Sequence, residues 1–122
     1  MASQEESKPG ESEVEKLLKD YQVMQDQLRA MAMQLEQLHA QKIEMDKAKE
    51  ELDKASGKVY FSVGGIIVET TKEKAQADIT DRSSLTEARI QSVNKQYAEF
   101  RNKEKQLNEK ITQLYKSGQG LQ

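Results

Sequence analysis

The chain contains no cysteine and no tryptophan, and it has one proline among 122 residues. The lack of cysteine excludes a disulfide framework, a thiolate metal site and a thiol nucleophile. Aromatic residues are scarce, with four tyrosines and two phenylalanines, whereas 33% of the residues are charged. Such a chain cannot enclose a large core of its own, and its composition is typical of an extended coiled coil.

Long apolar runs and an excess of one charge are missing as well. No segment approaches the roughly 20 apolar residues that a membrane span needs, and residues 1–10 lack the apolar core of a signal peptide. The formal net charge is −2 with both signs interspersed, so there is no basic stripe for nucleic acid. We therefore expect a cytoplasmic protein with no membrane partner and no nucleic-acid partner.

Side chains with the spacing of a catalytic or metal site are also absent. His39 is the single histidine, and no constellation of Cys, Asp or Glu stands at ligand spacing from it. The nearby carboxylates lack a facing base or metal partner: Glu44, Asp46, Glu50 and Glu51. We expect these residues on a solvated helix surface, and we expect no enzyme, no cofactor and no metal.

A heptad pattern covers the first half of the chain. Apolar residues step by three and four from Val14 to Leu52, with a positions at 14, 21, 28, 35, 42 and 49 and d positions at 17, 24, 31, 38, 45 and 52. The pattern predicts a helix over about 13–55, with Ser12 as N-cap, Glu15 as its capping-box partner and Gly57 after its end. Residues 1–12 are polar and acidic and are expected to be a disordered tail.

A second helix is predicted over about 71–116. Thr70-Thr71-Lys72-Glu73 has the pattern of a capping box, and a flexible tail is expected over 117–122. The seam runs through Ile79, Ser83, Thr86, Ile90, Val93, Tyr97, Phe100, Leu107, Ile111 and Leu114, and Glu104 interrupts it.

The two seams have nearly equal lengths, which predicts an antiparallel two-helix coiled coil. One register sets Leu28 near Phe100, and a register slipped by half a heptad is equally compatible with the sequence. Polar seam residues gather near the link between the helices, at Lys42, Lys49, Ser83 and Thr86. The coil is expected to be looser there, or these residues meet other subunits.

Between the helices, residues of about 58–69 predict a β-hairpin that turns at Gly64-Gly65. The glycines serve either a turn with positive φ or the close approach of a neighbour. Two strands alone are marginally stable and have open edges, so the hairpin is expected to assemble with others; the alternative is a hairpin folded back on its own helices. Alternation places Val59, Phe61 and Val63 on one face, and Ile66 and Val68 on one face of the partner strand. The expected assembly residues are Val59, Tyr60, Phe61, Val63, Gly64, Gly65, Ile66, Ile67 and Val68.

Residues 58–75 resemble the central segment of prefoldin β-type subunits, with the pattern V-Y-x-x-V-G-x-x-x-V-x-x-T-x-[KE]. Residues 37–52 and 103–111 are similar to the flanking helices of that family, and a single hairpin suggests the β type rather than the α type. The resemblance implies a mainly α fold: a long antiparallel coiled coil whose β-hairpin joins an intersubunit β-barrel. Archaeal and eukaryotic origins both stay open.

That resemblance also implies a function. Two α-type and four β-type subunits would form a hexamer that captures unfolded client proteins at the coiled-coil tips without ATP and delivers them to a group II chaperonin. The tip residues would be Val14, Leu17, Leu18, Tyr21, Met24, Leu107, Ile111, Leu114 and Tyr115. Heptad spacing favours seam packing for all of them except Leu18 and Tyr115. A different class, a coiled-coil scaffold or filament subunit that never binds unfolded chains, is the alternative.

Overall fold

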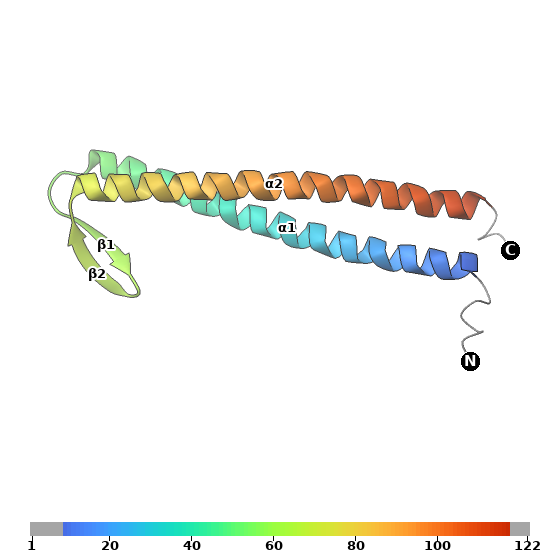
Figure 1. Ribbon diagram of the computed structural model, residues 1–122. Helices are drawn as coiled ribbons and strands as arrows, with labels where there is room; N and C mark the ends of the chain where they lie inside the picture. Colours follow the sequence, from blue (N-terminus) through green and yellow to red (C-terminus); the bar gives the residue numbers. More distant parts are fainter. Residues whose placement is uncertain (1–8, 118–122) are drawn as a thin grey trace. The chain divides into compact units, whose positions relative to one another are not determined.

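The computed structural model describes residues 9–117 and contains two long helices joined by a two-stranded sheet (Figure 1). Helix α1 spans Pro9–Lys54, strand β1 spans Val59–Val63, strand β2 spans Ile66–Thr70 and helix α2 spans Lys72–Lys116. The mainly helical fold with one hairpin is therefore confirmed. Tails were expected over 1–12 and 117–122; of these, residues 1–8 and 118–122 lie outside the described residues.

The start of α1 differs from the prediction. The helix begins at Pro9, and Ser12 lies inside it, so the predicted N-cap at Ser12 and its box with Glu15 are wrong. Proline is favoured in the first helical turn, because its fixed φ suits a helix and its missing N–H has no helical partner there in any case. The predicted disordered tail over 1–12 is therefore wrong for residues 9–12, which are helical.

The predicted seams are confirmed by burial. In α1, every predicted a and d position is buried or half-buried except Lys49, which is exposed because its charge is better solvated than packed. In α2, all the predicted seam positions are buried or half-buried, including the polar Ser83 and Thr86 and the interrupting Glu104. The most buried side chains are Leu17, Leu28, Leu38, Leu52, Thr86, Ile90, Val93 and Ile111.

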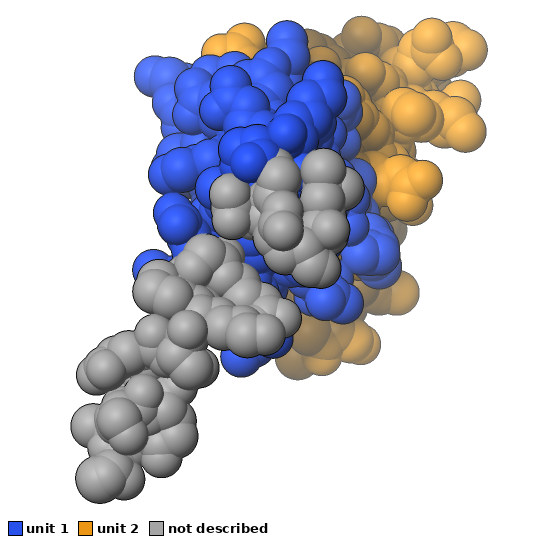
Figure 2. Space-filling model, turned by 90° about the vertical axis from the view of Figure 1, so that its right-hand side faces the viewer, with its two compact units in different colours: residues 1–33, 95–122 blue, residues 34–94 orange. Residues whose placement is uncertain are grey.

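The chain divides into two compact units, which Figure 2 distinguishes by colour. Unit 1 comprises residues 1–33 and 95–122, and unit 2 comprises residues 34–94. In unit 1, Gln25 Nε2 lies 3.4 Å from Glu104 Oε2. In unit 2, Lys42 Nζ lies 3.5 Å from Glu87 Oε1. Each contact joins α1 to α2 within its own unit and agrees with the register that sets Leu28 near Phe100.

The hairpin lies in unit 2 and turns at its two glycines. Strands β1 and β2 are antiparallel, with Val59 opposite Thr70 and Val63 opposite Ile66. Gly64 has φ +55° and Gly65 has φ +82°, which a two-residue type I′ turn requires. A Cβ at either glycine would meet no atom of this chain within 4 Å, so backbone conformation explains both glycines within the chain.

The N-cap of helix α2 lies one residue later in the chain than predicted. The backbone N–H of Lys74 donates to Thr71 Oγ1 at 3.1 Å, so Thr71 is the N-cap, and Thr70 is the last residue of β2. With the cap at Thr71, Glu73 is the second helical residue. It therefore stands where a carboxylate complements the positive end of the helix dipole rather than at the third position of a capping box.

Candidate functional site

The strand pairing sorts the hairpin side chains into two faces. Directly opposite residues of an antiparallel pair share a face, so one face carries Val59, Phe61, Val63, Ile66, Val68 and Thr70. We call it the apolar face. The other, the mixed face, carries Tyr60, Ser62, Ile67 and Glu69. The predicted alternation of Val59, Phe61 and Val63 against Ile66 and Val68 is confirmed by this register.

The chain leaves most of the hairpin uncovered. Only Val59 and Thr70, at the base, are half-buried, and the other eight strand residues are exposed. Phe61 is 41% exposed and Val68 39%, while Ile66 and Ile67 reach 65% and 73%. Both strands are edge strands, because the sheet has only these two. An apolar ladder with two free edges is a surface suited to another chain.

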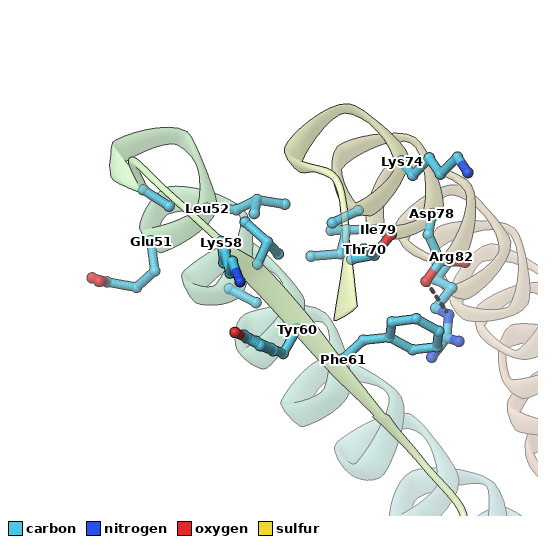
Figure 3. A pocket seen from close by; sticks show the side chains of 14 residues that line it. Glu51, Leu52, Lys58, Tyr60, Phe61, Thr70, Lys74, Asp78, Ile79 and Arg82 are labelled. Atoms are coloured by element: carbon cyan, nitrogen blue, oxygen red, sulfur yellow. Dashed lines mark ion pairs between the residues drawn. The ribbon is translucent and has the colours of Figure 1, made fainter. Parts of the chain in front are cut away.

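A groove of about 620 Å³ separates the base of the hairpin from the helix ends in unit 2 (Figure 3). Its lining is largely aliphatic and aromatic and includes Leu52, Phe61 and Ile79. Phe61 points towards Arg82 of α2, whose Nε pairs with Asp78 Oδ2 at 3.1 Å, and Tyr60 points away from it. The hairpin therefore leans over its own helices without being buried by them, and the groove offers packing surface rather than a reactive centre.

The predicted tip residues lie in unit 1, and the structure separates them by burial. Leu17 and Ile111 are 9% and 7% exposed, so they belong to the helix seam. The half-buried set is Val14, Tyr21, Met24, Leu107 and Leu114. Leu18 and Tyr115 are 43% and 46% exposed. Each follows a d-position leucine directly, which places both at the e position of the heptad. These two residues are the candidates for contacting another molecule.

Among the described residues, sequence reasoning did not single out four further large apolar residues that are exposed, namely Val23, Met33, Ile43 and Leu85. The sequence alone indicates that they are exposed, because each is apolar at a heptad position other than a or d. It also did not single out Lys72 or Gln76, whose side chains contact the end of α1. Those contacts join residues that are distant in sequence, so no local pattern indicated them.

The described residues contain no cluster of side chains suited to binding a metal ion. Within residues 9–117, no group of three or more His, Cys, Asp or Glu could hold a metal ion. His39 is exposed on α1, as expected. In the described part of the chain, no helix has the length and apolar character that a membrane span needs.

Two antiparallel helices and an uncovered hairpin define a chain built to be one part of an assembly. Comparison with known proteins agrees: the family model described as "Prefoldin subunit" matches residues 15–118, and the chain belongs to that family. Among curated relatives, the prefoldin subunit beta of Caldivirga maquilingensis is 34% identical over 101 residues, covering 81% of this chain and 84% of that protein. The prefoldin subunit beta of Methanosarcina acetivorans is 33% identical over 103 residues, covering 83% and 88%.

A solved structure is similar in fold. The crystal structure of the prefoldin beta subunit from Thermococcus strain KS-1 matches with a TM-score of 0.76 and 28% identity, covering 83% of this chain and 90% of that one. The resemblance to prefoldin β-type subunits is thus confirmed, and with it the role of a chaperone subunit. The alternative of a scaffold or filament subunit is not favoured.

Proposed function

We propose that this chain is one subunit of a cytoplasmic, ATP-independent holdase and that it has no enzymatic activity. Four β-type chains and two α-type chains assemble through their hairpins into a β-barrel body. The helix ends of unit 1 capture unfolded client proteins, and a group II chaperonin receives them. The observation that carries this proposal is the apolar face, because four of its six residues, Phe61, Val63, Ile66 and Val68, are exposed in the single chain.

Assembly through the hairpin is supported by the composition of its two faces. The apolar face carries Val59, Phe61, Val63, Ile66 and Val68, with Thr70 as its one polar residue, whereas the mixed face includes the carboxylate of Glu69. Burial of an unpaired carboxylate is costly. We therefore infer that the apolar face turns inwards in the assembly and the mixed face turns towards water.

Client capture is supported by the two exposed residues of unit 1. Leu18 and Tyr115 are free to contact a partner without opening the seam. The half-buried Met24 and Tyr21 add adaptable apolar surface in the same unit. The charged residues around them, such as Glu13, Glu15 and Lys116, keep that surface hydrated between encounters.

The decisive experiment is a mass determination of the purified chain, alone and mixed with an α-type subunit, followed by light scattering of a denatured client without nucleotide. We expect a hexameric mass in the mixture and suppressed scattering. A second preparation lacking residues 1–24 and 107–122 is expected to keep the hexameric mass and lose the suppression. A monomer that persists beside the α-type subunit contradicts assembly, and full suppression by the truncated complex contradicts capture at the helix ends.

A further inference from the structure

The ends of the two helices are tied together at the base of the hairpin in unit 2. The Nζ of Lys72, the first residue of α2, donates to the carbonyl oxygen of Asp53 at 2.9 Å and to that of Ala55 at 3.2 Å. One turn further on, Gln76 Nε2 donates to Asp53 Oδ1 at 3.0 Å. Lys72 and Gln76 are both half-buried. We call this set of three hydrogen bonds the base clasp.

The position of Lys72 is unfavourable for its own helix. A cation in the first turn opposes the helix dipole, whose positive end lies there. The last carbonyls of a helix, in contrast, lack internal partners and carry the negative end of the dipole. Lys72 directs its ammonium at the carbonyl of Asp53, in the last turn of α1, and at that of Ala55, directly after the helix ends at Lys54. Its charge is therefore explained by α1 and not by α2.

The hairpin is attached to the helices through two connections, and the base clasp lies where these connections meet the helix ends. The chain leaves α1 through Ala55, Ser56, Gly57 and Lys58 and returns to α2 through Thr71. Ser56, Gly57 and Lys58 are exposed, and Gly57 has φ +98°, so most of the outgoing connection has little packing of its own. Fixing the end of α1 against the start of α2 therefore restricts the direction in which the strands leave the helices.

We propose that Lys72 is a positioning residue for subunit assembly. Its ammonium holds the two helix ends at one separation and thereby aims the apolar face of the hairpin at a second prefoldin chain. This inference rests on the proposed assembly through the hairpin. Its ammonium donates to backbone carbonyls outside the strands, so it acts through the geometry of the base.

The test compares Lys72→Met, Lys72→Arg and Ile90→Val, the last being a seam substitution in unit 2 that leaves the base clasp intact. Methionine keeps an unbranched apolar stem and removes the three donors, whereas arginine retains donors and charge. Because the chain has no cysteine, Ser62→Cys and Thr80→Cys allow two spin labels to be attached at unique, exposed sites within unit 2. Two quantities are measured: the distance distribution between the labels, and the concentration for half-assembly of unlabelled variants with an α-type subunit.

We expect Lys72→Met to broaden the distance distribution and to raise the half-assembly concentration about tenfold, as the loss of charge-assisted hydrogen bonds predicts. Lys72→Arg should keep the distance distribution as narrow as in the original chain. Its half-assembly concentration should stay within about threefold of the original value. Ile90→Val should lower the thermal midpoint and change neither. The positioning role is overturned if Lys72→Met leaves the distance distribution unchanged, or if Ile90→Val has equal effects on both quantities. It is also overturned if Lys72→Met broadens the distribution but leaves the half-assembly concentration unchanged. If the unsubstituted chain does not assemble with an α-type subunit, the proposed function is refuted. The label distances then still decide whether Lys72 orders the hairpin.

Discussion

The hairpin of unit 2 and the helix ends of unit 1 both present apolar side chains to the surface, but they do so differently. In the hairpin, exposure is continuous, since Phe61 stands opposite Val68 and Val63 opposite Ile66 on one face. In unit 1, exposure alternates with burial, so that Leu17 is 9% exposed and its neighbour Leu18 is 43% exposed. A continuous ladder with free backbone edges is suited to one permanent partner, whereas isolated side chains on a closed seam are suited to brief and varied contacts.

The largest effect is expected from Phe61→Asp on the apolar face. The carboxylate would stand opposite Val68, and its burial without a partner in an assembled barrel costs several kcal/mol. We expect assembly with an α-type subunit to weaken by at least about a thousandfold, about 4 kcal/mol, while helix content stays unchanged. Analytical ultracentrifugation measures the first quantity and far-UV circular dichroism the second.

Ser62→Asp is the matched control for that substitution. Ser62 neighbours Phe61 in β1 but lies on the mixed face, opposite Ile67 and beside a face that already carries Glu69. Its assembly should stay within about threefold of the original chain, because a carboxylate that faces water is not desolvated. Equal losses in the two variants would mean that the two faces do not differ in the assembly.

A smaller effect, on folding rather than assembly, should separate two adjacent leucines of unit 1. Leu17→Ala removes a seam side chain and should lower the free energy of unfolding by about 2–3 kcal/mol. Leu18→Ala removes an exposed side chain and should change it by less than about 0.5 kcal/mol. Urea unfolding of the assembled complex measures both. Similar losses from both substitutions would show that Leu18 packs into the seam.

The contrast between these leucines was predictable from the heptad phase alone. Spacing of three and four residues fixed which face of each helix is buried, and it included polar Thr86 because phase, not polarity, decides what a seam contains. The hairpin and its turn were equally readable, since few residues other than glycine accept positive φ at two consecutive positions.

Other features depended on interactions that no local pattern contains. The beginning of α1 at Pro9 was missed because proline suits both a disordered tail and the first turn of a helix. No local pattern distinguishes Lys72 from other lysines near a helix start, and its role depends on carbonyls at Asp53 and Ala55 that only the folded chain brings close. The partner of an exposed residue such as Leu18 is likewise set by another molecule, which the sequence of this chain does not encode.

Client capture offers a sharper comparison, because two exposed leucines lie in different units. Leu18 in unit 1 is 43% exposed and Leu85 in unit 2 is 62% exposed. If capture belongs to the helix ends of unit 1, Leu18→Ser in the assembled complex should raise the amount of complex needed to halve client scattering by about threefold, equivalent to about 0.6 kcal/mol. Leu85→Ser should leave that amount unchanged despite its greater exposure. An effect of Leu85→Ser as large as that of Leu18→Ser would place capture along the whole coil.

The smallest effect is expected at the polar contact between the helices of unit 2. Lys42 Nζ and Glu87 Oε1 are 3.5 Å apart, with side chains 31% and 46% exposed, so water screens their attraction. Glu87→Gln keeps the shape of the side chain and removes its charge, and it should change the free energy of unfolding by less than about 0.5 kcal/mol. Measurement at low and at high salt should give the same small difference. A clear, salt-dependent loss would instead show that this ion pair, and not the buried Ile90 and Thr86 beside it, holds the polar part of the seam together.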